Sequence, residues 1–188
     1  MPVGAEEHHQ EELVVVFTNA RSFSRAMNET GSGRMLEFLD EMYARLGEEV
    51  VRRGGEIIKY LGDGLLAVYA VDHDPPDATR RAVEAGVAMR RAYAELVSRH
   101  DLRVATELEV GVSLGRCERG IVGHESLRCA DVFGEAVSVA AVIGHHRGIA
   151  VTAQVREALG SRFATTQLPH ATVKWLDAPL ELWEIDDA

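Results

Sequence analysis

The sequence has 188 residues, and its 30 acidic against 20 basic side chains give a formal net charge of -10 at pH 7. Its 46% hydrophobic and 27% charged residues exclude a disordered chain, and its length is sufficient to bury the core of one domain. We expect no nucleic-acid partner, because binding to a phosphate backbone depends on clustered Lys and Arg.

The cysteines and the apolar runs of the sequence indicate in which cellular compartment the protein is expected. Cys117 and Cys129 do not form a CxxC pair, which argues against a disulfide scaffold or structural zinc site. Arg116 and Arg119 could lower the pKa of the Cys117 thiol, but a buried, inert thiol is the favoured interpretation. No apolar run approaches the roughly 20 residues of a membrane span, and the start lacks the features of a signal peptide. We expect a cytoplasmic protein without membrane contact.

The distribution of polar and apolar residues predicts the first elements of the chain. Residues 1–12 carry four Glu without periodicity and are interpreted as a flexible acidic tail. Residues 13–188 are expected to form a single domain. An apolar, β-branched run at 13–17 predicts a buried strand, and the polar stretch at 18–22 predicts a loop.

A helix and a hairpin come next. Apolar residues between 35 and 50 recur at spacings of three and four, which predicts a helix ended by Gly54-Gly55. Two short apolar runs, at 56–61 and 65–69, flank Gly62-Asp63-Gly64. An Asp-Gly pair between such runs is typical of a β-hairpin.

The rest of the chain completes an α/β (α+β) pattern. Together with the earlier elements it gives a ferredoxin-like βαββαβ order with extra C-terminal strands and helices. We expect a mostly antiparallel sheet of about seven strands with helices on one side. The predicted elements are helices at 78–100, 135–143 and 153–159, strands at 108–114 and 149–151, a hairpin arm at 115–123, and edge strands at 163–167 and 180–185.

Two segments could carry chemistry. Glycines on both sides of Asp63 would present its carboxylate at a hairpin tip, where it suits a hard cation such as Mg²⁺. Taken alone, this segment favours an ordinary β-turn, since Asp-Gly is a common turn pair. The connection after residues 13–17 could direct backbone N–H groups at a phosphate. The neighbouring pairs His8-His9 and His145-His146 have poor spacing for metal binding.

Three segments together resemble the catalytic domain of the class III nucleotidyl cyclases, the family of adenylate and guanylate cyclases. The family pattern reads F-x-D-I-x-x-F-T, then K-x-x-G-D-G, then D-x-x-G-x-x-V-N-x-A-x-R. Residues 17–24, 59–64 and 131–142 follow it in this order. The glycine-rich hairpin of the family is similar to residues 111–123, and its L-K-G stretch is similar to residues 173–175.

The resemblance implies a dimer with active sites at the interface. One subunit supplies two metal-binding Asp residues, which hold Mg²⁺ or Mn²⁺. The other supplies a Lys and an Asp that read the base, and an Asn and an Arg that stabilise the transition state. The 3′-hydroxyl of the nucleotide attacks its α-phosphate and pyrophosphate leaves, while two metal ions stabilise the attacking and leaving oxygens.

Several positions match this family. Asp63 takes the second metal position, and Lys59 with Asp131 takes the base-reading positions in the adenine type. Arg116 matches a position that contacts the triphosphate, and Lys174 matches another more loosely.

Three positions depart from the family. Asn19 replaces the first metal Asp, Ser138 the transition-state Asn and Val142 the transition-state Arg. Asn keeps an oxygen but loses the charge on which cation affinity depends. Ser is shorter than Asn, and Val donates no hydrogen bond. Loss of one preorganised donor costs roughly 10²–10³ in rate.

We therefore predict a dimeric pseudo-cyclase that binds ATP or another purine nucleotide and acts in signalling. One alternative is an active adenylate cyclase that converts ATP to cyclic AMP and pyrophosphate, either alone or as a heterodimer with a complete cyclase subunit. A second alternative is a dimerisation module without a ligand.

Overall fold

The computed structural model describes residues 8–186. The helices are α1 (Phe23–Thr30), α2 (Ser32–Arg52), α3 (Pro75–His100), α4 (Glu135–Ile143) and α5 (Ala153–Leu159). The strands are β1 (His8–Ala20), β2 (Glu56–Tyr60), β3 (Leu65–Ala70), β4 (Leu108–His124), β5 (Leu127–Phe133), β6 (Ile149–Thr152), β7 (Thr165–Gln167) and β8 (Leu182–Ile185). Their order along the chain confirms the predicted βαββαβ core and the α+β class.

One sheet joins all of these strands, in the order β2-β3-β1-β4-β6-β8-β7. β5 lies off this path and pairs with β4. The pairing is antiparallel except between β4 and β6, which run parallel. β8 was expected at an edge but lies between β6 and β7, so only the three-residue β7 ends that side of the sheet.

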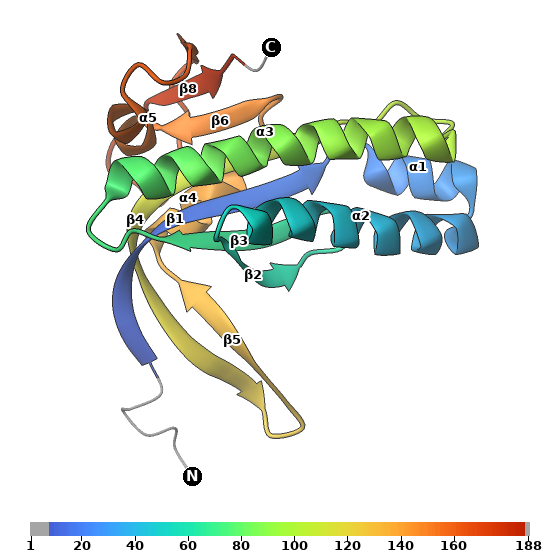
Figure 1. Ribbon diagram of the computed structural model, residues 1–188, viewed down its shortest axis with the longest axis horizontal. Helices are drawn as coiled ribbons and strands as arrows, with labels where there is room; N and C mark the ends of the chain where they lie inside the picture. Colours follow the sequence, from blue (N-terminus) through green and yellow to red (C-terminus); the bar gives the residue numbers. More distant parts are fainter. Residues whose placement is uncertain (1–7, 187–188) are drawn as a thin grey trace.

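Alternate residues of β1 fill two cores, one on each face of the sheet. Val14 and Val16 belong to the core formed with α2 and α3, whereas Leu13 and Val15 are buried with residues of α4. Successive strand residues point to opposite faces, so a continuous apolar run requires cover on both. The expectation of helices on one side is therefore wrong: α2 and α3 cover one face and α4 packs on the other (Figure 1).

β1 is longer than the apolar pattern indicated. It begins at His8 and continues to Ala20, so residues 8–12 are strand rather than tail and the predicted loop begins later. All thirteen positions pair with β4. The first residues of β1 are mostly exposed, which explains why their polarity resembled that of a tail. Residues 1–7 lie outside the described part of the chain.

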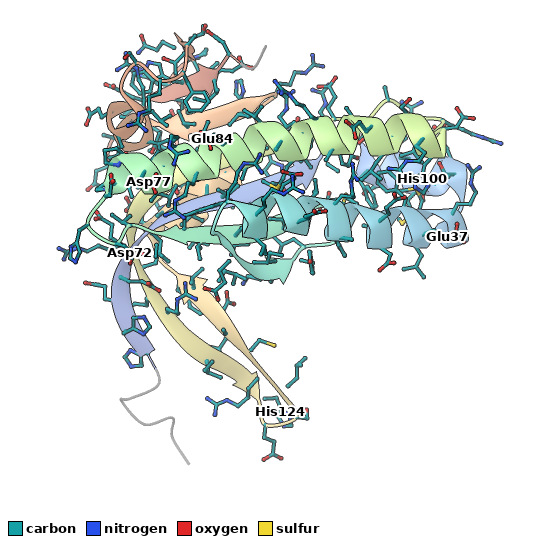
Figure 2. The ribbon with its side chains drawn as sticks, viewed as in Figure 1. Glu37, Asp72, Asp77, Glu84, His100 and His124 are labelled. Atoms are coloured by element: carbon teal, nitrogen blue, oxygen red, sulfur yellow. The ribbon has the colours of Figure 1, made fainter. Side chains whose placement is uncertain are left out.

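β4 and β5 form an arm that projects from the body of the molecule (Figure 1). β4 is one continuous strand, where the sequence indicated a strand at 108–114 and a separate arm at 115–123. His124 lies at the tip of this arm (Figure 2). Several large apolar side chains of the arm are exposed: Ile121, Val122, Leu127 and Phe133.

The helices follow the predicted ranges closely, with one omission. α1 was not predicted, and it is held by the burial of Phe23 and Ala26. α3 begins earlier than expected, because the Asp74 side chain accepts a hydrogen bond from the Asp77 amide at 3.0 Å and caps the helix. Figure 2 shows Asp77 at this end of α3. Within residues 8–186 none of the helices combines the length and apolar character needed to cross a bilayer.

Two glycines allow α4 to lie directly against the sheet. A Cβ on Gly111 of β4 would collide with the Ala140 carbonyl oxygen and the Gly144 amide nitrogen. A Cβ on Gly144 would in turn meet the ring of Phe17, on β1. The position of α4 therefore depends on the absence of side chains at both glycines.

We expect Gly111→Ala to lower the free energy of unfolding by about 1–3 kcal/mol, the usual cost of overpacking a core. Gly33→Ala is the control, because a Cβ there meets no atom within 4 Å and the residue lies inside α2. That variant should be stabilised by about 0.5–1 kcal/mol. Urea denaturation measures both, and equal stability of the two variants would contradict this account of α4 packing.

Candidate functional site

The end of β1 and the tip of the β2–β3 hairpin are fastened together. The Ala20 amide donates a hydrogen bond to the Asp63 carbonyl oxygen at 2.7 Å. A Cβ on Gly64 would collide with the Thr18 carbonyl oxygen, so only glycine permits this approach. These contacts hold Asp63 beside Asn19, as both predicted metal positions require.

A tyrosine of α2 supports the same hairpin from the other side. The Tyr43 hydroxyl donates to the Gly62 carbonyl oxygen at 2.8 Å, and its ring stacks on Tyr60 with centroids 4.1 Å apart. Desolvation raises the pKa of the Tyr43 hydroxyl, which keeps it a protonated donor at neutral pH. The hairpin tip is thereby tied to α2 as well as to β1.

A cavity of about 410 Å³ opens at this junction. It is bounded by the end of β1, the first residues of α1, the hairpin tip, β4 and the segment after α4. Its polar and charged side chains include Asn19, Arg21, Asp63, Glu109, His145 and Arg147. Both predicted metal positions thus face one cavity, and the strand-to-helix connection expected to suit a phosphate lines it too.

Glu109 is a functional candidate that sequence reasoning missed. It lies opposite Asn19 in the β1–β4 register and is only 3% exposed. The Asn19 amide nitrogen donates to Glu109 Oε2 at 3.0 Å, and the Arg21 guanidinium lies 3.8 Å from Oε1. The available signal was one acidic residue within the predicted strand at 108–114, whose other residues are mostly apolar.

A second pair of predicted residues meets on the face of the sheet that carries α4. Lys59 Nζ donates to Asp131 Oδ2 at 2.6 Å, and the ammonium lies 5.9 Å from the Phe133 ring centroid. A register shift between Ile57 and Lys59 makes this possible. Ile57 packs toward α2, whereas regular alternation would put Lys59 on that same face. The bulge therefore directs Lys59 toward β5.

Residues 5–183 match the family described as the adenylate and guanylate cyclase catalytic domain. The chain belongs to this family. An adenylate cyclase of Mycobacterium tuberculosis is 29% identical over 167 residues, which cover 87% of this chain and 37% of that protein. A Dictyostelium discoideum adenylate cyclase is 24% identical over 184 residues, or 93% of this chain and 9% of that protein. The chain spans well under half the length of these curated relatives.

Solved structures agree on the fold. The adenylyl cyclase CyaB of P. aeruginosa superposes with a TM-score of 0.89 at 18% identity, over 97% of each chain. A rhodopsin-guanylyl cyclase core of converted specificity, solved in complex with ATPαS, gives 0.83 at 19% identity, over 96% of this chain and 98% of that one. At these identities the likeness shows the cyclase fold.

The two predicted transition-state positions lie together on the exposed side of α4. Ser138 and Val142 are one helical turn apart and therefore share a face. Ser138 is exposed and Val142 is 37% exposed. This face can contact a ligand or a second subunit, but it presents only a hydroxyl and an aliphatic group at these two positions.

The two positions expected to contact the triphosphate do not line the cavity that contains Asn19 and Asp63. Arg116 is exposed on β4 and lines a different cavity, of about 360 Å³, together with Glu135. Lys174 is exposed in a turn between β7 and β8. Among residues 8–186, no hydrogen bond or ion pair joins the Asn19–Glu109 pair to the Lys59–Asp131 pair.

Cyclases of this family use a divalent cation, and the side chains around Asn19 do not fit one. The amide nitrogen of Asn19 is directed at Glu109, whose other oxygen faces Arg21. In the described part of the chain, no three His, Cys, Asp or Glu side chains are grouped so as to hold a metal ion. His145 instead packs on Phe17, with ring centroids 6.0 Å apart.

We expect Asn19→Asp to lower the free energy of unfolding by about 1–3 kcal/mol, because it removes the donor to a buried carboxylate and opposes two acidic groups. Asn19→Asp combined with Glu109→Gln should recover most of this loss, since the glutamine amide can donate back to the aspartate. Thermal or urea unfolding of the two variants measures the difference. Equal losses would show that residues 19 and 109 are not coupled.

The two thiols should differ in reactivity. The predicted burial of Cys117 is confirmed. Burial raises the pKa of its thiol to about 11, so we expect almost no thiolate at pH 7–8 and an unreactive group. Cys129 is exposed on the arm. A disulfide reagent at pH 8 should modify one thiol of the native chain quickly and the second only after denaturation. Fast modification of the Cys129→Ser variant would contradict this.

Proposed function

We propose that the chain is a cyclase domain of impaired activity that binds a purine nucleotide and acts in signalling through that binding. One contrast supports this above all. The base-reading pair Lys59–Asp131 is formed, while the α4 face carries Ser138 and Val142 in place of an amide and a guanidinium. The groups expected to recognise the ligand are present, and those expected to stabilise the transition state are not.

The pair suits adenine. An ammonium donor beside a carboxylate acceptor complements the adenine edge, where N1 accepts and the N6 amino group donates. The Lys59 side chain is 39% exposed and Asp131 is 15% exposed, so the ammonium can reach a ligand while the carboxylate stays fixed. Asp131 Oδ1 also accepts from the Val132 amide at 2.8 Å, which fixes the carboxylate orientation.

Loss of donors on α4 accounts for the impairment. A developing negative charge on the phosphate would meet the apolar Val142 and the short hydroxyl of Ser138. Removing one donor of this kind costs roughly 10²–10³ in rate. Effects within one site are not additive, yet the defects at Asn19, Ser138 and Val142 act on the same reaction.

We further propose that the chain works as a homodimer. The exposed apolar side chains of the β4–β5 arm offer a surface for a second copy, and the family builds its sites between subunits. A heterodimer with a complete cyclase would lend this chain the missing Asn and Arg, so a gain of cyclic AMP on mixing would reveal it. Nucleoside triphosphates are cytoplasmic ligands, and we place the protein there.

The test is calorimetry with ATP alongside an assay for cyclic AMP. We expect binding without product, and a loss of affinity of roughly tenfold to a hundredfold in Lys59→Ala and Asp131→Ala, the range for charged hydrogen bonds. Asp40→Ala is the control, because Asp40 is exposed on α2 and lies outside these groups. In the cyclic AMP assay, both the nucleotide and the metal salt are supplied at saturating concentration.

Two results would contradict the proposal. Cyclic AMP formed by the pure chain and abolished in Asp63→Ala would show an active adenylate cyclase. Failure to bind ATP or GTP under any condition, from a chain that still dimerises, would indicate a dimerisation module without a ligand.

A further inference from the structure

The first metal position of this chain is occupied by an interaction within the protein. Glu109 Oε2 accepts from the Asn19 amide at 3.0 Å, and Oε1 faces Arg21 at 3.8 Å. Glu109 is 3% exposed, so both partners satisfy a carboxylate that has almost no contact with solvent. A cation binding to Glu109 would have to displace both the amide and the guanidinium from its carboxylate.

The charges around the cavity also disfavour a cation. The lining contains the carboxylates of Asp63 and Glu109, and the guanidinium groups of Arg21 and Arg147. The formal charges of these two carboxylates and two guanidinium groups sum to zero. Because the affinity for hard divalent cations depends on the number of charged ligands, a lining in which two guanidinium groups offset two carboxylates is a poor match for them. One of the two carboxylates is already engaged by Asn19 and Arg21.

The same lining suits a polyanion. Guanidinium groups bind phosphate oxygens through paired, charge-assisted hydrogen bonds. The Arg21 side chain remains 39% exposed despite its contact with Glu109, and Arg147 is exposed. The two arginines reach the cavity from separate segments, one after β1 and one after α4. A volume of about 410 Å³ lies within the range of small-ligand sites.

We propose that this cavity binds the polyphosphate chain of a purine nucleotide directly on Arg21 and Arg147, without a divalent cation. The inference rests on the proposed function, because it concerns the same nucleotide. The Asn19 amide and Arg21 engage the carboxylate of Glu109. The exposed parts of the Arg21 and Arg147 guanidinium groups supply the hydrogen-bond donors that phosphate oxygens need. The chain then recognises the free nucleotide as well as, or better than, its magnesium complex.

The experiment compares ATP binding by calorimetry in EDTA with binding in excess Mg²⁺ or Mn²⁺. We expect affinity in EDTA to equal or exceed that with either cation. Arg21→Gln and Arg147→Gln should each weaken binding in EDTA by roughly tenfold. Arg25→Gln is the matched control, since Arg25 is exposed on α1 and pairs with Glu29 at 2.9 Å. That variant should bind as the unchanged chain does.

A charge-swapped variant tests the reason for this behaviour. Asn19→Asp with Glu109→Gln keeps an amide–carboxylate pair but moves the carboxylate to the metal position. In this double variant Mg²⁺ should tighten ATP binding by tenfold or more, whereas Glu109→Gln alone should show no such gain.

Three outcomes would overturn the inference. They are tenfold or greater tightening by Mg²⁺ or Mn²⁺ in the unchanged chain, unchanged affinity in both arginine variants, and a double variant indifferent to cations. ATP binding that needs a cation but is still weakened by Lys59→Ala would overturn this inference alone. Absence of ATP binding in every condition would overturn the proposed function with it.

Discussion

The candidate cavity depends on how closely the β2–β3 hairpin approaches the end of β1. The approach is possible because Gly64 has no side chain to meet the Thr18 carbonyl oxygen. The Ala20–Asp63 hydrogen bond then fixes the tip, and the hydroxyl of Tyr43 holds it from α2. Asp63 therefore sits on a hairpin anchored at both sides, where a free turn would let its carboxylate move away from β1.

The second constraint is electrostatic and lies between β1 and β4. In the sequence, Asn19 stands where the family resemblance predicts a metal-binding carboxylate. In the structure it is the donor that a buried Glu109 requires, so the two residues form one unit. The carboxylate at this place belongs to Glu109 of β4, directly across the strand pair from Asn19. A buried carboxylate without such partners would be costly, which explains why an acidic residue is tolerated in a central strand.

Sequence patterns predicted most elements because their apolar residues recur with the right period. The exceptions have identifiable causes. The start of β1 is mostly exposed, so its polarity hid a strand that is held by pairing with β4. α1 is short and buries only Phe23 and Ala26. The continuous apolar run at 13–17 already implied cover on both faces of the sheet, and α4 supplies the second cover.

The sequence by itself determined the cyclase family, the α+β class and the identity of Lys59, Asp63 and Asp131, because motif spacing and hairpin signals are local. Only the tertiary structure decided which of these groups meet. The Lys59–Asp131 contact needs a bulge in β2, and the partner of Asn19 is ninety residues away along the chain. Strand register sets such contacts, and register is fixed by the packing of the whole sheet rather than by any local pattern.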